Sequence, residues 1–152
     1  LPLAASRDNV MVTRTFSKVY SLAGLRVGYA VTAPETINEL RRIQLPFTVS
    51  TLAEVAAVEA LKYQDRVRER VARNAAGVGY LTDALRSRGI PVADSQANFV
   101  YAGFGERSGA ITEGLHKSGY IVRPVLPPGW LRITAGSAEE NSGLIEALTR
   151  LL

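Results

Sequence analysis

The stretch that decides the fold reads Thr15-Phe-Ser-Lys-Val-Tyr-Ser-Leu-Ala-Gly-Leu-Arg-Val-Gly-Tyr29. It places a lysine, two hydroxyls and an arginine in a loop between two predicted strands, residues 10–13 and 26–32. The first strand has the composition of a buried strand, and Lys18 has the apolar neighbours Phe16 and Val19. Apolar surroundings and a nearby cation favour the neutral amine of a lysine, which is the form that attacks a carbonyl. The sequence therefore indicates a nucleophilic lysine, with a surface lysine as the alternative.

An anion site is predicted in the same loop. Arg26 carries a planar fork of donors suited to a phosphate dianion, and Thr15 and Ser17 could add neutral donors to the same oxygens. Gly24 and Gly28 would allow the backbone to approach closely. A surface loop remains the alternative interpretation of these residues.

The composition narrows the functional class. The chain has 152 residues, 47% hydrophobic and 21% charged, which is typical of one globular domain rather than a disordered segment. Its net charge of +4 is too mild and too scattered to indicate nucleic acid. It has no cysteine and a single histidine, His116, so no metal site is predicted. No apolar run approaches the roughly 18 residues of a membrane span, and we expect a cytoplasmic protein without membrane partners.

Helices are predicted on both sides of the middle of the chain. Thr32, Pro34 and Glu35 are typical of a helix start, so we expect a helix over residues 32–44. Residues 50–88 have helical periodicity, and their length predicts a break near residues 63–65 or at Gly77 and Gly79. The arginine-rich residues 65–73 are interpreted as a solvated face of this helix.

The last third of the chain predicts a small β-α-β-β-α unit. Strands are expected at residues 98–101, 121–123 and 130–134, and a short helix at residues 108–118. Ser137 and Glu140 form the pattern of a capping box. The apolar stripe of the final helix contains Leu144, Ile145, Leu148 and Leu151.

The stretch from Thr15 to Tyr29 closely resembles the lysine segment of the fold-type I pyridoxal-phosphate aminotransferases. More narrowly, it is similar to the histidinol-phosphate and aromatic amino-acid aminotransferases. This resemblance implies that Lys18 is the catalytic residue and binds pyridoxal phosphate covalently. It also implies that Arg26 binds the cofactor phosphate together with the hydroxyls of Thr15 and Ser17.

The resemblance extends along the chain. Residues 46–50 resemble the loop before the long interdomain helix of that family, and residues 95–100 resemble the strand that opens its small domain. Two further segments resemble the family's substrate-facing arginine segments. The resemblance implies that Arg132 binds the substrate carboxylate, that Arg123 helps bind a substrate phosphate, and that Asn98 contacts substrate. The alternative for each arginine is an exposed strand residue in an ion pair.

The resemblance also implies a domain organisation within an α/β fold. Residues 1–49 would end a large cofactor-binding domain, residues 50–88 would form a bridging helix, and residues 89–152 would form a small C-terminal domain. The earlier half of the family's active site has no counterpart here, so the chain would be a fragment that is inactive by itself. The complete enzyme would be a homodimer.

The reaction implied by the resemblance is a ping-pong transamination between an amino acid and a 2-oxo acid such as 2-oxoglutarate. Leu126 and Trp130 favour an aromatic side chain in the donor, whereas Arg123 could hold the phosphate of histidinol phosphate only with help from the absent half of the site. We therefore expect a histidinol-phosphate or aromatic aminotransferase that also acts on phenylalanine or tyrosine. Three alternatives remain open: a fold-type I lyase or decarboxylase, a catalytically incompetent interaction fragment, and a purely structural domain in which Lys18 is a surface residue.

Overall fold

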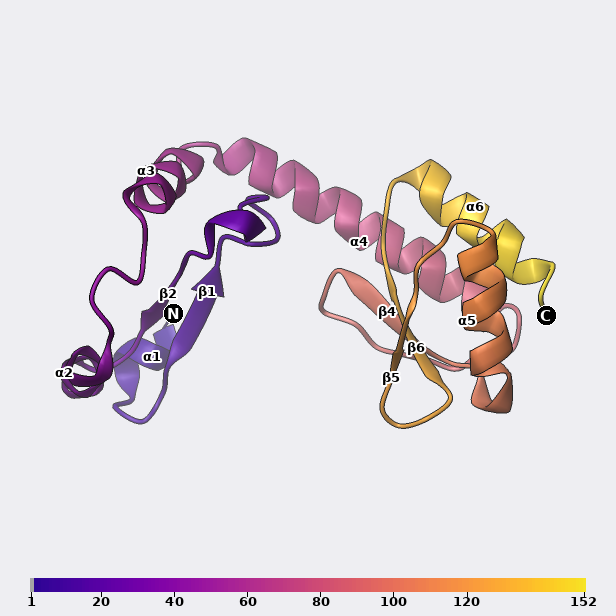
Figure 1. Ribbon diagram of the computed structural model, residues 1–152, viewed down its shortest axis with the longest axis horizontal. Helices are drawn as coiled ribbons and strands as arrows, with labels where there is room; N and C mark the ends of the chain where they lie inside the picture. The colour runs from indigo at the N-terminus through magenta and orange to yellow at the C-terminus, as the bar shows by residue number, and fades with distance from the viewer. Residues whose placement is uncertain (1) are drawn as a thin grey trace. The chain divides into compact units, whose positions relative to one another are not determined.

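The computed structural model describes residues 2–152, and Figure 1 follows them by colour along the chain. They form a mixed α/β structure with two compact units, Leu1–Arg70 and Val71–Leu152. The boundary between the units falls inside one helix, α4 (Gln64–Arg86). Among the described residues, no helix combines the length and the apolar character needed to cross a membrane.

The first unit contains an antiparallel hairpin of β1 (Val12–Thr15) and β2 (Gly28–Val31). A 3-10 helix, η1 (Ala23–Leu25), lies in the connection between the two strands. The remaining helices of this unit are α1 (Pro2–Ser6), α2 (Pro34–Ile43), α3 (Thr51–Ala60) and the first residues of α4.

Both predicted strands of the hairpin need correction. The strand expected to be buried at residues 10–13 lies at Val12–Thr15 and is largely exposed, because it pairs with β2 alone among the described strands. The strand expected at residues 26–32 begins at Gly28. Arg26 cannot join the ladder because its backbone is left-handed, with φ of 52°.

The glycines of the hairpin differ in their roles. A Cβ at Gly28 would come within 2.6 Å of the Arg14 carbonyl oxygen, so the strand pairing itself requires glycine there. Gly24 has no atom within 4 Å of its Cβ position, and close approach of either glycine to an anion stays a prediction.

The start of α2 also differs from the prediction. Its N-cap is Ala33, which makes no side-chain cap. The Thr32 hydroxyl, expected to cap this helix, donates instead to the Val10 carbonyl at 2.9 Å and ties the two ends of the hairpin together. Pro34 does occupy the first turn.

The long helical region is interrupted once. α3 ends at Ala60 and α4 begins at Gln64, next to the predicted break at residues 63–65. α4 continues through Gly77 and Gly79 without interruption. The predicted boundaries of the three domains remain a prediction.

The second unit is a four-stranded antiparallel sheet with helices on its buried face. The strand order is β3 (Val92–Ala93), β4 (Phe99–Gly103), β6 (Trp130–Thr134) and β5 (Arg123–Val125). The helices are α5 (Ser108–Lys117), α6 (Ala138–Thr149), the short η2 (Gly105–Arg107) and the remainder of α4. β6 has the predicted bounds, but β5 begins at Arg123 rather than at residue 121, and β3 was not predicted.

One core holds this unit together. Alternate residues of β4 and β6 are buried, and they pack with the inward stripes of α4, α5 and α6. The largest fully buried side chains are Leu81, Leu85, Val100, Ile111, Leu115, Leu131, Ile133 and Leu148.

The capping box at the start of α6 is confirmed. The Ser137 hydroxyl accepts the Glu140 amide at 3.2 Å, and the Glu140 carboxylate accepts the Ser137 amide at 2.7 Å. Leu144 and Leu148 of the predicted stripe are buried. Leu151 follows the end of the helix but still packs against the core.

Candidate functional site

Lys18 begins a tight turn three residues after the end of β1. The Ser21 amide donates to the Lys18 carbonyl at 2.9 Å, and the Leu22 amide donates to the Phe16 carbonyl at 3.1 Å. These two bonds close the segment 18–21, which we call the lysine turn. Ser21 has φ of 59°, a left-handed conformation that is uncommon for a residue other than glycine.

The side chain of Lys18 is exposed. Its neighbour Phe16 is buried and packs against Tyr20, with ring centroids 4.9 Å apart. The apolar side chains therefore pack among themselves and leave the amine in water. The expectation that they would desolvate Lys18 is wrong for the described part of the chain.

The two predicted hydroxyls lie beside each other. Thr15 Oγ1 and Ser17 Oγ are hydrogen-bonded at 2.9 Å, and Thr15 Oγ1 also accepts the Ser17 amide at 3.0 Å. This local bonding fixes both side chains within three residues of Lys18. Both residues are at least partly exposed, so an incoming anion can reach them.

The backbone pairing of the hairpin extends past β2 to Val27, the residue after Arg26. Thr15 is paired with Gly28, and the Phe16 amide donates to the Val27 carbonyl at 3.2 Å. Arg26 itself precedes β2 and is the C-cap residue of η1. Its side chain is exposed, and its Nη1 donates to the Ala23 carbonyl at 2.8 Å.

The two substrate arginines predicted from the sequence are brought together in the second unit. Arg123 of β5 and Arg132 of β6 are paired directly across the antiparallel ladder. Arg123 is exposed, whereas Arg132 is half-buried and its guanidinium lies over the Phe99 ring, 5.0 Å from the centroid. The Arg132 Nε atom is buried and has no hydrogen-bond partner among the described residues.

Aromatic side chains share this face of the sheet. Tyr101 is the β4 partner of Arg132, and its ring stacks on Trp130 with centroids 5.0 Å apart. The Tyr101 hydroxyl donates to the Leu126 carbonyl. Phe99 and Tyr101 were not proposed from the sequence, although the alternation of apolar and aromatic residues in β4 places both opposite the core.

Asn98 is less well supported as a site residue. It precedes β4, and its carbonyl accepts the Ala135 amide at 3.0 Å. Within residues 2–152, its side chain makes no hydrogen bond to Arg123 or Arg132.

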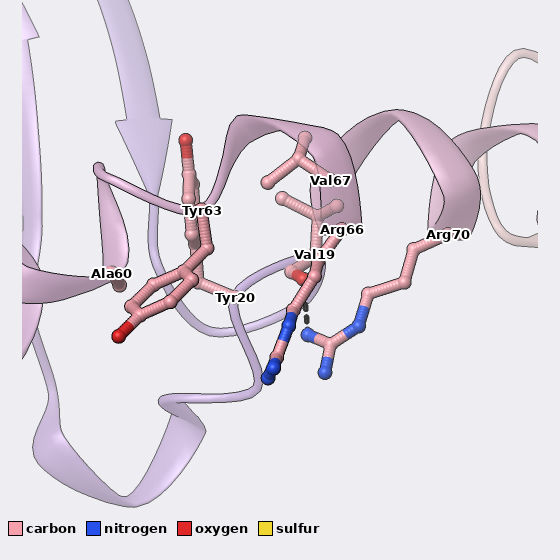
Figure 2. Close-up of a pocket in the computed structure, with 7 residues that line it drawn as sticks. All are labelled: Val19, Tyr20, Ala60, Tyr63, Arg66, Val67 and Arg70. Carbon is pink, nitrogen blue, oxygen red and sulfur yellow. Dashed lines mark hydrogen bonds between the residues drawn. The ribbon is translucent and has the colours of Figure 1, made fainter.

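A pocket of about 120 Å³ lies beside the lysine turn, within the first unit. Figure 2 shows Tyr20, Tyr63 and Arg66 among the side chains that line this pocket, with Arg70 bonded to the Val19 carbonyl. Sequence analysis missed the α4 residues of this pocket, because they are about 50 residues from the turn and have the pattern of a solvated face. In residues 2–152, no group of acidic and histidine side chains is arranged to hold a metal ion.

Comparison with known proteins gives one family. The family model described as aminotransferase class I and II matches residues 1–148. The chain is 42% identical over 149 residues to a histidinol-phosphate aminotransferase of Thermobifida fusca, covering 97% of this chain and 40% of that protein. It is 41% identical over 150 residues to an aromatic amino acid aminotransferase of Cutibacterium acnes, covering 99% of this chain and 42% of that protein.

A solved structure of an aminotransferase also matches this chain. The histidinol-phosphate aminotransferase from Sinorhizobium meliloti, in complex with pyridoxal-5'-phosphate, matches with a TM-score of 0.83 at 30% sequence identity. The match covers 95% of this chain and 41% of that one. The chain thus spans about two fifths of the length of the curated relatives it matches.

Proposed function

Because this chain belongs to the class I and II aminotransferases, we propose that it supplies the C-terminal part of a pyridoxal-phosphate-dependent aminotransferase. The amino donor is histidinol phosphate or an aromatic amino acid, and the acceptor is 2-oxoglutarate. In this proposal, residues 1–49 end the cofactor-binding domain, residues 50–88 bridge the domains and residues 89–152 form the small domain. The complete enzyme is a homodimer.

The donors of the lysine segment fit the proposed cofactor. An exposed amine at Lys18 suits the aldehyde carbon, and the adjacent hydroxyls of Thr15 and Ser17 suit phosphate oxygens. The exposed guanidinium of Arg26 adds the positive charge that a phosphate dianion requires. When bound, pyridoxal phosphate supplies an electron-withdrawing ring next to the substrate's α-carbon.

Lys18 has a second role in the proposal. With pyridoxal phosphate bound, the Lys18 Nζ atom would take the proton from the substrate's α-carbon and deliver it to the cofactor's aldehyde-derived carbon, so that the amino group stays with the cofactor and the substrate leaves as an oxo acid. Thr15, Ser17 and Arg26 hold the phosphate end and so fix the position of the reacting atoms relative to Nζ.

The pairing of Arg123 with Arg132 is the observation that carries the substrate proposal. Like charges directly opposite each other on neighbouring strands repel, so this arrangement is unfavourable unless an anion lies between them. The buried, unpartnered Nε of Arg132 supports the same interpretation, because a bound oxyanion would satisfy it. A carboxylate or phosphate of the donor has the required chemistry.

The stacked rings of Tyr101 and Trp130 support a donor that carries a ring. They lie on the same sheet face as the arginines, so a substrate held by its anion could place an imidazole or phenyl group against them.

The test is an assay of the full-length protein with histidinol phosphate, phenylalanine and tyrosine as donors and 2-oxoglutarate as acceptor. The proposal predicts formation of glutamate and of the matching oxo product, without release of carbon dioxide. Release of carbon dioxide would identify the decarboxylase alternative. The absence of both turnover and cofactor absorbance would identify an incompetent interaction fragment.

A further inference from the structure

The lysine turn contains an unfavourable backbone conformation. Ser21 is in the left-handed region, which is sterically unfavourable for a residue other than glycine. Within the turn, the Ser21 amide is bonded to the Lys18 carbonyl at 2.9 Å, whereas the Val19 carbonyl has its partner outside the turn. The conformation of the segment that carries Lys18 therefore depends on contacts from elsewhere.

Arg70 supplies those contacts from α4. Its Nη1 atom donates to the Val19 carbonyl at 2.6 Å and to the Ser21 hydroxyl at 3.0 Å (Figure 2 draws the first bond). One guanidinium nitrogen thus holds the residue directly after Lys18 and the residue with the left-handed backbone. Hydrogen bonds from a charged donor are stronger than those between neutral groups.

The same helix contacts the turn at a second point. Gln64 Nε2 approaches the Tyr20 hydroxyl at 3.4 Å, and Tyr20 packs on Phe16. Tyr20 therefore has protein on two sides. Arg66 lines the same pocket, but its guanidinium lies over the Tyr63 ring at 5.2 Å and has no bond to the turn.

We propose that Arg70 is a positioning residue for Lys18: by holding the turn from α4, it fixes the direction in which the lysine side chain leaves the backbone. This inference rests on the proposed function, in which Lys18 reacts with pyridoxal phosphate. Loss of Arg70 leaves every predicted cofactor contact in place and changes only the order of the turn. The effect of losing Arg70 can therefore be measured separately from the effect of losing the phosphate contact of Arg26.

The test compares three variants of the full-length protein without cofactor. Arg70→Met removes both hydrogen bonds and keeps most of the apolar stem. Arg70→Lys retains a charged donor for one acceptor. Arg66→Met is the matched control, because it removes a guanidinium from the same pocket without touching the turn. Circular dichroism and thermal melting establish that all variants are folded.

The first measurement is amide hydrogen exchange in the peptide that contains Ser21 and Leu22. Arg70→Met is expected to speed exchange roughly tenfold, Arg70→Lys less, and Arg66→Met not at all. The second measurement is the rate at which added pyridoxal phosphate becomes fixed to Lys18 by borohydride, determined by peptide mass. Arg70→Met is expected to slow this reaction several-fold at saturating cofactor.

Unchanged exchange in Arg70→Met, or equal effects of Arg66→Met, would overturn the proposal. Faster exchange with an unchanged rate at Lys18 would also overturn it, because Arg70 would then order the turn without positioning the lysine. If wild-type Lys18 does not react at all, the proposed function fails, and the inference that depends on it fails too. If Arg70→Met leaves the exchange rate unchanged while wild-type Lys18 is labelled normally, the positioning role of Arg70 is wrong and the proposed function still stands.

Discussion

Arg123 and Arg132 face each other directly across the ladder between β5 and β6. Arg132 is further held over the Phe99 ring, while Arg123 is exposed at the sheet edge. The two side chains therefore differ in conformational freedom. Arg132 is held in one position, whereas Arg123 can adapt to a second anionic group. This difference leads to the first prediction.

Arg123→Ala in the full-length protein should reduce kcat/KM for histidinol phosphate selectively. The phosphate loses a charge-assisted bond, so we expect a loss of roughly ten- to a hundredfold, with phenylalanine changed much less. Steady-state kinetics with both donors measure the ratio. Equal losses with the two donors would mean that Arg123 serves the carboxylate or the fold.

Arg26→Ala and Arg132→Ala should separate two anion sites. Arg26→Ala should weaken retention of pyridoxal phosphate, because it removes a charge-assisted bond of about 1.5–3 kcal/mol. Arg132→Ala should leave the cofactor bound and raise KM for every donor. Cofactor absorbance after dialysis and the two KM values distinguish them, and equal loss of cofactor from both variants would contradict the assignment.

Ser137→Ala should destabilise the second unit by about 1 kcal/mol, because it removes the hydroxyl that accepts the Glu140 amide. Ser142→Ala on the same helix is the control, since its hydroxyl bonds only to the Glu139 carbonyl within the helix and alanine favours helix. Urea unfolding measures both. Equal destabilisation by the two variants would show that the cap has no special role.

The chain by itself should self-associate. The connection between α2 and α3 exposes large apolar side chains, including Leu45 at 74% and Phe47 at 100%. Phe47→Asn should reduce association, because it removes apolar area and asparagine tolerates the positive φ of 57° at this position. Sedimentation velocity would detect the change. A monodisperse wild-type chain with a cooperative melt would contradict the prediction.

Local patterns in the sequence predicted much of the second unit. The strand at residues 130–134 and the capping box at Ser137 follow from alternation and from residue type within a few positions, so no distant contact was needed. The first unit was harder to predict from the sequence. Thr32 has the sequence of a helix cap, yet it bonds to Val10, 22 residues away, which no local pattern indicates.

The site divides in the same way. Thr15, Ser17 and Arg26 lie within twelve residues of one another in the sequence, so a local pattern could single them out as phosphate donors, and that role stays a prediction. The pairing of Arg123 with Arg132 depends on which strands are neighbours in the sheet, and the sequences of β5 and β6 do not indicate the strand order. The contact of Arg70 with the lysine turn joins residues 49 to 51 positions apart, so no local pattern could predict it.

The central claim is that Lys18 binds pyridoxal phosphate. The most direct measurement is borohydride reduction of the full-length protein with the cofactor, followed by peptide mapping. The account predicts a reduced pyridoxyl group on Lys18, and loss of both label and visible cofactor band in Lys18→Ala with the fold retained. A label on Lys62 or Lys117 instead of Lys18 would contradict it.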